Sequence, residues 1–204
     1  MKLFNKNPKE DLGLIQDEIQ TSVSFTSFFT AVTLFFVGLL ITQYKSFDPS
    51  VSMPILFLIL STFGFLYSTL IFANASGKIA RFEEKDIRKD MGLGNSLSEY
   101  FGVYLLVLSI PLVINVITED YFLRIATIIA ALGGLSIYHF AGFSIMGRSF
   151  KKTHYIFLLL LVALEVMMYL FQFNNIFYFT STAVVLILLL IVISALSREW
   201  IFFS

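Results

Sequence analysis

The sequence predicts an all-α polytopic membrane protein, a bundle of six transmembrane helices with its N-terminus and C-terminus in the cytoplasm. The first observation is composition: 57% of the 204 residues are hydrophobic and only 14% are charged, whereas soluble domains carry about 25% charged residues. The second is six apolar stretches near 20 residues long, the length that crosses a bilayer. The third is the distribution of Lys and Arg between the polar segments that separate them.

The apolar stretches fix the predicted element boundaries. We place the spans at 22–43, 53–75, 99–118, 121–146, 154–173 and 176–197. Residues 1–21 form a cytoplasmic N-terminal segment, 76–98 a cytoplasmic loop and 198–204 a cytoplasmic tail. None of these segments is long enough for a separate domain, so a functional site has to lie within the bundle or at its ends.

Basic residues indicate the orientation. Twelve of the 14 Lys and Arg residues lie before span one, between spans two and three, between spans four and five, or after span six. Only Lys45 and Arg124 lie on the other side. Because Lys and Arg in short loops stay in the cytoplasm, both chain ends are expected there.

The N-terminal segment allows two interpretations. Asn7 and Pro8 resemble an N-cap and a first helical residue, and Leu12, Ile15 and Ile19 share one helix face. The segment is either an amphipathic helix at the membrane interface or a plain extension of the first span.

The connections differ in length. Gly92 and Gly94 are expected to break the helix that extends span two into the loop, and Ser96 to Glu99 to form a capping box for span three. The turns at 118–120 and 174–175 are so short that spans three and four, and spans five and six, should pack as antiparallel hairpins.

Small and hydroxyl-bearing residues form stripes on several spans. In span one, Thr26, Thr30 and Thr33 share a face and either pack against a neighbouring helix or line a solute path. The stripes of spans two and four predict close packing between helices. Their members are Ser61, Gly64, Ser68 and Ala75 in span two, and Ala130, Gly134 and Ala141 in span four.

Span five carries the strongest functional signal. Glu165 is the only acidic residue well inside any span, and Tyr169 and Gln172 follow on the same face. Because an ionised carboxylate within a bilayer costs several kcal/mol, Glu165 has to be protonated, paired or hydrated. Intramembrane acids are functional candidates for this reason, although a neutral acid that serves only assembly is the alternative.

Few groups are available to meet that carboxyl. We expect His139 of span four to hydrogen-bond Glu165, although a lone His is also commonly structural. In span three, Pro111 should kink the helix beside Asn115, and we treat both as candidate gating residues.

The sequence gives no positive sign of an enzyme. It has no hydrolase or nucleotide-binding motif and no Cys, and a haem between His139 and His154 is disfavoured because their predicted depths differ. We therefore predict no catalytic residue, no metal site and no cofactor. The zero net charge argues against nucleic acid as a partner.

These observations favour a channel or transporter for an ion, a proton or a small solute, with Glu165 in its path. Tyr169 and Gln172 would continue this path outward, and the opposite wall would be lined by Thr26, Thr30 and Thr33. The alternative is a non-catalytic structural or accessory subunit of a membrane complex, and an intramembrane enzyme comes third. The expected surroundings are the lipid bilayer of the plasma membrane and either further copies of the chain in a homo-oligomer or a membrane partner subunit.

Overall fold

The computed structural model describes the backbone of residues 8–79, 84–145 and 152–202 and the side chains of 13–79, 86–140 and 154–196. The described chain is helical apart from short turns. Its α-helices are α1 (Pro8–Thr42), α2 (Ser52–Ile79), α3 (Glu84–Leu97), α4 (Tyr104–Ile117), α5 (Tyr121–Ile145), α6 (Lys152–Phe171) and α7 (Ile176–Phe202). Two 3-10 turns, η1 (Tyr44–Ser46) and η2 (Pro49–Val51), join α1 to α2, and a π-helix, η3 (Ser98–Val103), joins α3 to α4.

The prediction of an all-helical fold with six membrane-length helices is confirmed. Six helical segments in the described chain are long and apolar enough to cross a bilayer, with α3, η3 and α4 together forming the third. Their apolar windows are Gly13–Thr42, Pro49–Ile79, Asp86–Ile117, Tyr121–Phe140, His154–Phe171 and Ile176–Leu196. These helices indicate a multi-pass membrane protein.

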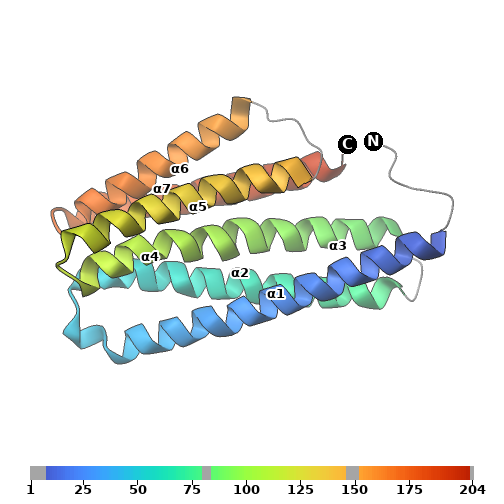
Figure 1. Ribbon diagram of the computed structural model, residues 1–204, viewed down its shortest axis with the longest axis horizontal. Helices are drawn as coiled ribbons and strands as arrows, with labels where there is room; N and C mark the ends of the chain where they lie inside the picture. The colour runs from blue at the N-terminus through green and yellow to red at the C-terminus, as the bar shows by residue number, and fades with distance from the viewer. Residues whose placement is uncertain (1–7, 80–83, 146–151, 203–204) are drawn as a thin grey trace.

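The helices run side by side along one long axis (Figure 1). Helix α1 packs along α2, α2 packs on α3, η3 and α4, α5 packs on α4, and α6 forms a hairpin with α7. Helices α1 and α6 lie at opposite edges of the bundle in Figure 1. We call the end where α1 begins and α7 ends the terminal end, and the end with the turns at 43–51, 118–120 and 172–175 the hairpin end.

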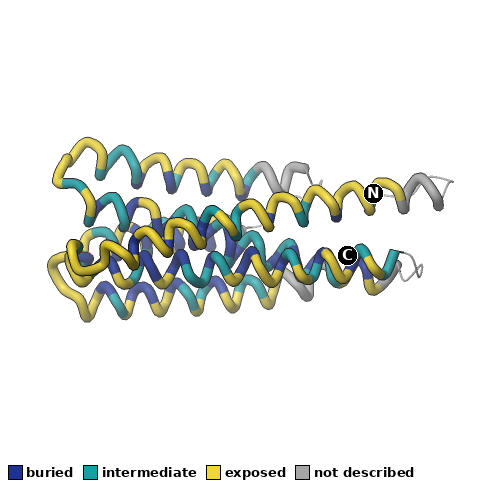
Figure 2. The backbone as a smooth tube through the Cα atoms, turned by 90° about the horizontal axis from the view of Figure 1, so that it is seen from below, coloured by how far each residue is buried: buried dark blue, intermediate teal, exposed yellow. Residues whose placement is uncertain are grey.

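Burial is distributed as expected for helices surrounded by lipid. Figure 2 shows buried positions where helices face one another and exposed positions along their outer sides. Many exposed residues are large and apolar, among them Phe35, Ile137 and Leu159, which are 67%, 71% and 71% exposed. Such surface is stable against acyl chains but not against water.

The first helix is continuous from Pro8 to Thr42, so the plain extension of span one is observed rather than a separate interfacial helix. Ile19 is fully buried and packs with Phe72 and Ala75 of α2 and with Ile87 and Met91 of α3. The start of α1 is therefore attached to the bundle by apolar contacts. Residues 8–12 have no described side chains, so the predicted contribution of Leu12 lies outside the described residues.

The prediction that Gly92 and Gly94 end a helix is wrong, because α3 runs through both. A Cβ at Gly94 would lie 2.6 Å from the Phe72 ring of α2, so this glycine allows close contact rather than a break. Tertiary packing overrides the helix-propensity cost of about 1 kcal/mol. The capping box at Ser96 to Glu99 is also absent, since the helix continues through η3.

The small-residue stripe of α2 packs as predicted. Ser61, Gly64, Ser68 and Ala75 are all buried, and the Ser61 hydroxyl donates to the Gly102 carbonyl at 2.7 Å. The described part of the α5 stripe does not pack against other described residues. Ala130 and Gly134 are exposed, nothing lies within 4 Å of a Cβ at Gly134, and the side chain of Ala141 lies outside the described residues.

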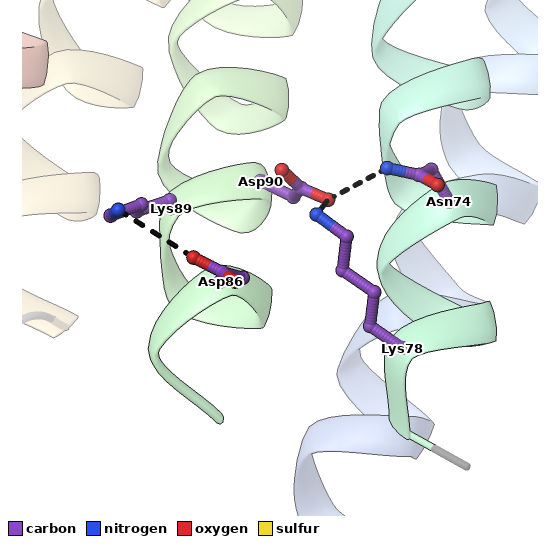
Figure 3. Close-up of polar contacts among 5 residues, drawn as sticks. All are labelled: Asn74, Lys78, Asp86, Lys89 and Asp90. Atoms are coloured by element: carbon purple, nitrogen blue, oxygen red, sulfur yellow. Dashed lines mark hydrogen bonds and ion pairs between the residues drawn. The ribbon is translucent and has the colours of Figure 1, made fainter. Parts of the chain in front are cut away.

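Charged residues tie α2 to α3 near the terminal end (Figure 3). The Lys78 ammonium lies 2.8 Å from the Asp90 carboxylate, and the Asn74 amide donates to the same oxygen at 3.0 Å. Asp86 and Lys89 form a longer pair within α3, at 3.5 Å. Since the side chains of these pairs are partly exposed, they contribute little energy, but they are consistent with an aqueous boundary at this end.

Candidate functional site: a buried polar seam

Six polar side chains follow one another through the apolar interior where η3, α4, α5 and α6 meet. We call this row the polar seam. From the terminal end to the hairpin end, its members are Glu99, Tyr104, His139, Glu165, Asn115 and Gln172. Five of them are at most 3% exposed, and Glu99 has a side chain that is 25% exposed.

Glu165 lies in the middle of the seam. It is 0% exposed, and neither carboxyl oxygen has a hydrogen-bond partner among the described residues. It follows His154 by eleven positions and precedes Phe171 by six, distances of about 16 Å and 9 Å along a helix. The carboxyl group is therefore far from both ends of its helix.

Helix α4 presents an apolar residue at the level of Glu165. Helices α4 and α6 are parallel, and the contacts Asn115–Gln172 and Tyr100–Phe157 both join residues 57 positions apart. The same offset places Leu108, which is fully buried, beside Glu165. A carboxylate ion in this position would lack both water and a counter-charge, which makes it strongly unfavourable.

Gln172 and Asn115 close the seam toward the hairpin end. The Asn115 amide donates to the Gln172 side-chain carbonyl at 2.8 Å, and the Gln172 amide donates to the Leu112 carbonyl at 2.9 Å. These bonds join α4 to α6 just beyond Pro111, which is buried inside α4. The pair satisfies polar groups that would be costly if left unpaired.

Glu99, Tyr104 and His139 form the part of the seam nearest the terminal end. The Tyr104 hydroxyl lies 2.5 Å from Nδ1 of His139, and the nearer Glu99 carboxylate oxygen lies 3.9 Å from the same nitrogen. The ring centroid of His154, in the first turn of α6, lies 5.7 Å from that of His139. The depth difference that we expected between the two histidines is therefore not found.

The π-helix positions this group. In η3 the Tyr104 amide donates to the Glu99 carbonyl, five residues earlier. This wider turn therefore joins two members of the seam, Glu99 and Tyr104. Phe101 and Gly102 of η3 lie directly on Gly64 of α2, where a Cβ would approach Phe101 to 2.7 Å. Single π-helical turns are rare in proteins, and those that occur often lie at functional sites.

The predicted hydrogen bond between His139 and Glu165 does not form. His139 is held by Tyr104 and contacts the rings of His154 and Phe157, which precede Glu165 by eleven and eight positions. The physical reason is register: α5 meets the first turns of α6 rather than its middle. Sequence alone cannot give that register, because it depends on how the two helices cross.

The threonines of α1 do not line the seam. Thr26 and Thr33 are buried against α2, where their hydroxyls lie 2.7 Å from that of Thr69 and 2.9 Å from that of Thr62. Thr30 donates to its own helix, at the Thr26 carbonyl. Since α1 and α6 lie at opposite edges of the bundle (Figure 1), these threonines pack against α2 and do not reach the seam.

Tyr169, the remaining predicted path residue, follows Glu165 by one turn and packs partly buried against the main core. Glu99, Tyr104 and His154 were not among the predicted site residues, because Glu99 was interpreted as a helix cap. The available signal was its position next to an aromatic stretch that carries Tyr100 and Tyr104. No group of three or more metal-ligating side chains occurs in the part of the chain whose side chains are described.

Comparison with protein-family models, with curated proteins and with solved structures gives no match for this chain.

Proposed function

We propose that the protein is a membrane transporter in which Glu165 binds and releases a proton during the transport cycle. The observation that supports this proposal is the complete burial of a carboxyl group with no hydrogen-bond partner among the described residues. Leu or Met would fill an apolar core at lower cost than an unpaired acid at mid-depth. Packing alone therefore does not explain why Glu165 occupies this position.

The surroundings of Glu165 favour a proton over a larger solute. A proton binds to a carboxylate without needing extra volume, and the neutral acid is tolerated in an enclosed site far better than the ion. The enclosure also favours a transporter over an open channel, because a carboxyl group that is 0% exposed has to become hydrated before it can release its proton.

The seam suggests how access would alternate. In the enclosed state Glu165 is neutral, and loss of its proton favours a state in which water reaches it. Pro111 cannot donate a backbone hydrogen bond to Val107, so α4 has a weak point close to Leu108. The Asn115–Gln172 contact, which joins α4 to α6 beyond that point, would have to open for release at the hairpin end.

The location of the protein is part of the proposal. Basic residues gather in the segments at the terminal end, so we place this end in the cytoplasm of a cell whose plasma membrane holds the protein. Proton movement then occurs between the cytoplasm and the outside. Assembly into a homo-oligomer is compatible with the exposed outer faces of the helices and remains a proposal.

The first prediction concerns Glu165→Gln, which keeps the shape of the side chain but cannot release a proton. In liposomes that contain a pH-sensitive dye, with the membrane potential clamped by potassium and valinomycin, proton flux should fall by at least about 100-fold, the lower end of what a positioned proton-transfer group contributes. The matched control is Glu119→Gln, which changes an exposed acid in the turn before α5 and should leave flux unchanged. Wild-type flux in folded Glu165→Gln would refute the proposal.

A second candidate function is supported by a different observation. The small residues Ala130, Gly133 and Gly134 are exposed on α5, and small residues on a membrane helix allow another helix to approach closely. This arrangement favours an accessory subunit whose partner covers α5. Purification in mild detergent distinguishes the two functions, because a stoichiometric companion protein together with inactive liposomes supports the accessory subunit.

A further inference from the structure

We propose that Glu99, His139 and Tyr104 form a second proton site, which takes up protons from water at the terminal end before they reach Glu165. This inference rests on the proposed transport function and extends it, because it assigns the entrance of the path to three residues on η3, α4 and α5. The ligand is a proton, and the two groups that bind it are the Glu99 carboxylate and the His139 imidazole.

The location of these residues supports uptake at that end. His154, the neighbour of His139, is the third residue of α6, and Lys151 and Lys152 come just before it. Lysines at the end of an apolar segment lie near the membrane boundary. The group therefore lies nearer the terminal end than Glu165, which lies about 16 Å beyond His154 along α6.

Exposure decreases along the proposed path. The Glu99 side chain is 25% exposed and that of His139 is 1% exposed, while Glu165 is 0% exposed. A carboxyl group at the rim can exchange protons with solvent directly, whereas a buried one needs a carrier. The 3.9 Å between the Glu99 oxygen and Nδ1 of His139 is slightly longer than a hydrogen bond, so a small movement of Glu99 brings them into contact.

The chemistry is a proton transfer in two balanced steps. The Glu99 carboxylate accepts a proton from a hydronium ion, which leaves as water, and becomes a neutral acid. It then gives this proton to Nδ1 of His139, which becomes an imidazolium while Glu99 returns to its carboxylate form. The Tyr104 hydroxyl, which bonds to Nδ1 in the structure, has to turn aside for this step and acts as a positioning residue.

Ionisable groups from three neighbouring helical segments lie next to His139. The ionisable side chains next to it are Glu99 from η3, Tyr104 from α4 and His154 from α6. Tyr100 and Tyr138 contact the Tyr104 ring. Glu99 stabilises an imidazolium, whereas a charged His154 would oppose it. On α7, which packs on η3, the residues from Ile176 to Leu196 include no charged side chain.

An apolar barrier separates this site from Glu165. Phe157 and Leu161 of α6 are both buried and lie between the two levels within the main core cluster. Phe157 contacts Tyr104 and His139 through its ring. The proton therefore reaches Glu165 only when this barrier is hydrated or moved, which couples passage to a conformational change instead of allowing a continuous leak.

The test compares variants of both sites in the same liposome assay. Glu99→Gln should reduce proton flux by about tenfold, because water can partly take over proton delivery from an exposed carboxyl group. His139→Gln should reduce it by about 100-fold. Tyr104→Phe, which keeps the ring but frees Nδ1, should shift the pH at which flux is half-maximal without abolishing flux. Glu119→Gln, with the same chemical change on an exposed turn, should behave as wild type.

The outcomes separate this inference from the proposed function. If Glu165→Gln stops flux but folded Glu99→Gln and His139→Gln carry wild-type flux, the second site is refuted and the transporter remains. If Glu165→Gln carries full flux, the transporter itself is refuted, and the entrance site falls with it.

A measurement that does not depend on flux covers variants that fold poorly. Infrared difference spectra of the purified wild type between acidic and neutral pH should show the carbonyl stretch of a protonated carboxyl group that is lost in Glu99→Gln and is retained in Glu119→Gln. A titrating band that is unchanged in Glu99→Gln would overturn the assignment of Glu99, whatever the transport result.

Discussion

The polar seam contains two kinds of buried polar group, which differ in the hydrogen bonds that their neighbours offer. The Asn115 and Gln172 carboxamides are hydrogen-bonded to each other and to the Leu112 carbonyl. Glu165, two turns earlier on α6, has no such partner among the described residues. The carboxamide pair is explained by stability, whereas the carboxyl group gains no hydrogen bond from the described residues.

The carboxamide pair leads to a stability prediction. Gln172→Leu leaves the Asn115 amide buried without this partner and should lower the free energy of unfolding by about 1–3 kcal/mol. The double variant Asn115→Leu with Gln172→Leu removes both groups and should recover part of this loss. Thermal unfolding in detergent measures both, with an expected coupling energy of about 0.5–2 kcal/mol. Strictly additive effects would show that the bond between them contributes nothing.

Individual site residues were predictable to different degrees. Glu165 is a functional candidate from the sequence alone, because an acid in the middle of an apolar stretch is rare and costly. The hydrogen-bond partner of His139 could not be predicted from the sequence. Tyr104 and Glu99 lie on another helical span, and their distance from His139 depends on how α4 and α5 cross. Hydrogen bonds between helices require a register that composition and periodicity do not contain.

Among the helices, a glycine of α2 is tightly packed, whereas a glycine of α5 has open space around it. Gly64 lies against the backbone of η3, where a Cβ would approach Phe101 to 2.7 Å, while nothing lies within 4 Å of a Cβ at Gly133. The first contact involves backbone atoms that cannot move aside without shifting η3. The second glycine faces outward from the described bundle.

This contrast predicts the effect of one added methyl group. Gly64→Ala should lower the free energy of unfolding by about 1–3 kcal/mol through overpacking, and it should also disturb proton flux because η3 carries Glu99. Gly133→Ala is the matched control and should be neutral or slightly stabilising, since Ala is the better helix former. Equal melting temperatures for the two variants in detergent would contradict the close contact of α2 with η3.

The boundaries of α3 show why such elements are hard to predict. Two glycines within three residues normally indicate a helix end, yet α3 passes through Gly92 and Gly94, and Gly94 leaves room for the Phe72 ring. The π-helix that follows leaves no simple pattern in the sequence. It is a local adjustment of turn width, and it depends on what packs against the helix.

For the molecule as a whole, the number of spans was predictable and the arrangement was not. Six apolar stretches determine six helices because backbone groups within a bilayer must bond internally. Their order in space follows from side-chain packing, so that α1 is paired with α2 at one edge and α6 lies at the other (Figure 1). The threonine stripe of α1 therefore packs on α2, one of the two interpretations that the sequence allowed.

The orientation in the membrane is open to a direct test because the chain contains no Cys. Single cysteines at Gln16, near the terminal end, and at Glu119, at the hairpin end, replace exposed residues. In intact cells a membrane-impermeant maleimide should label Glu119→Cys, and it should label Gln16→Cys only after permeabilisation. The reverse pattern would place the basic segments outside the cell and would reverse the direction of the proposed path.

The pairing of α1 with α2 has a consequence for biosynthesis. The hydroxyl contacts Thr26–Thr69 and Thr33–Thr62 lie entirely within the first 79 residues. Since the N-terminal part of a chain emerges first from the ribosome, these bonds can form while the later spans are still being translated. The first hairpin then offers the small-residue face of α2 as a ready-made surface, on which the third span docks as it enters the lipid.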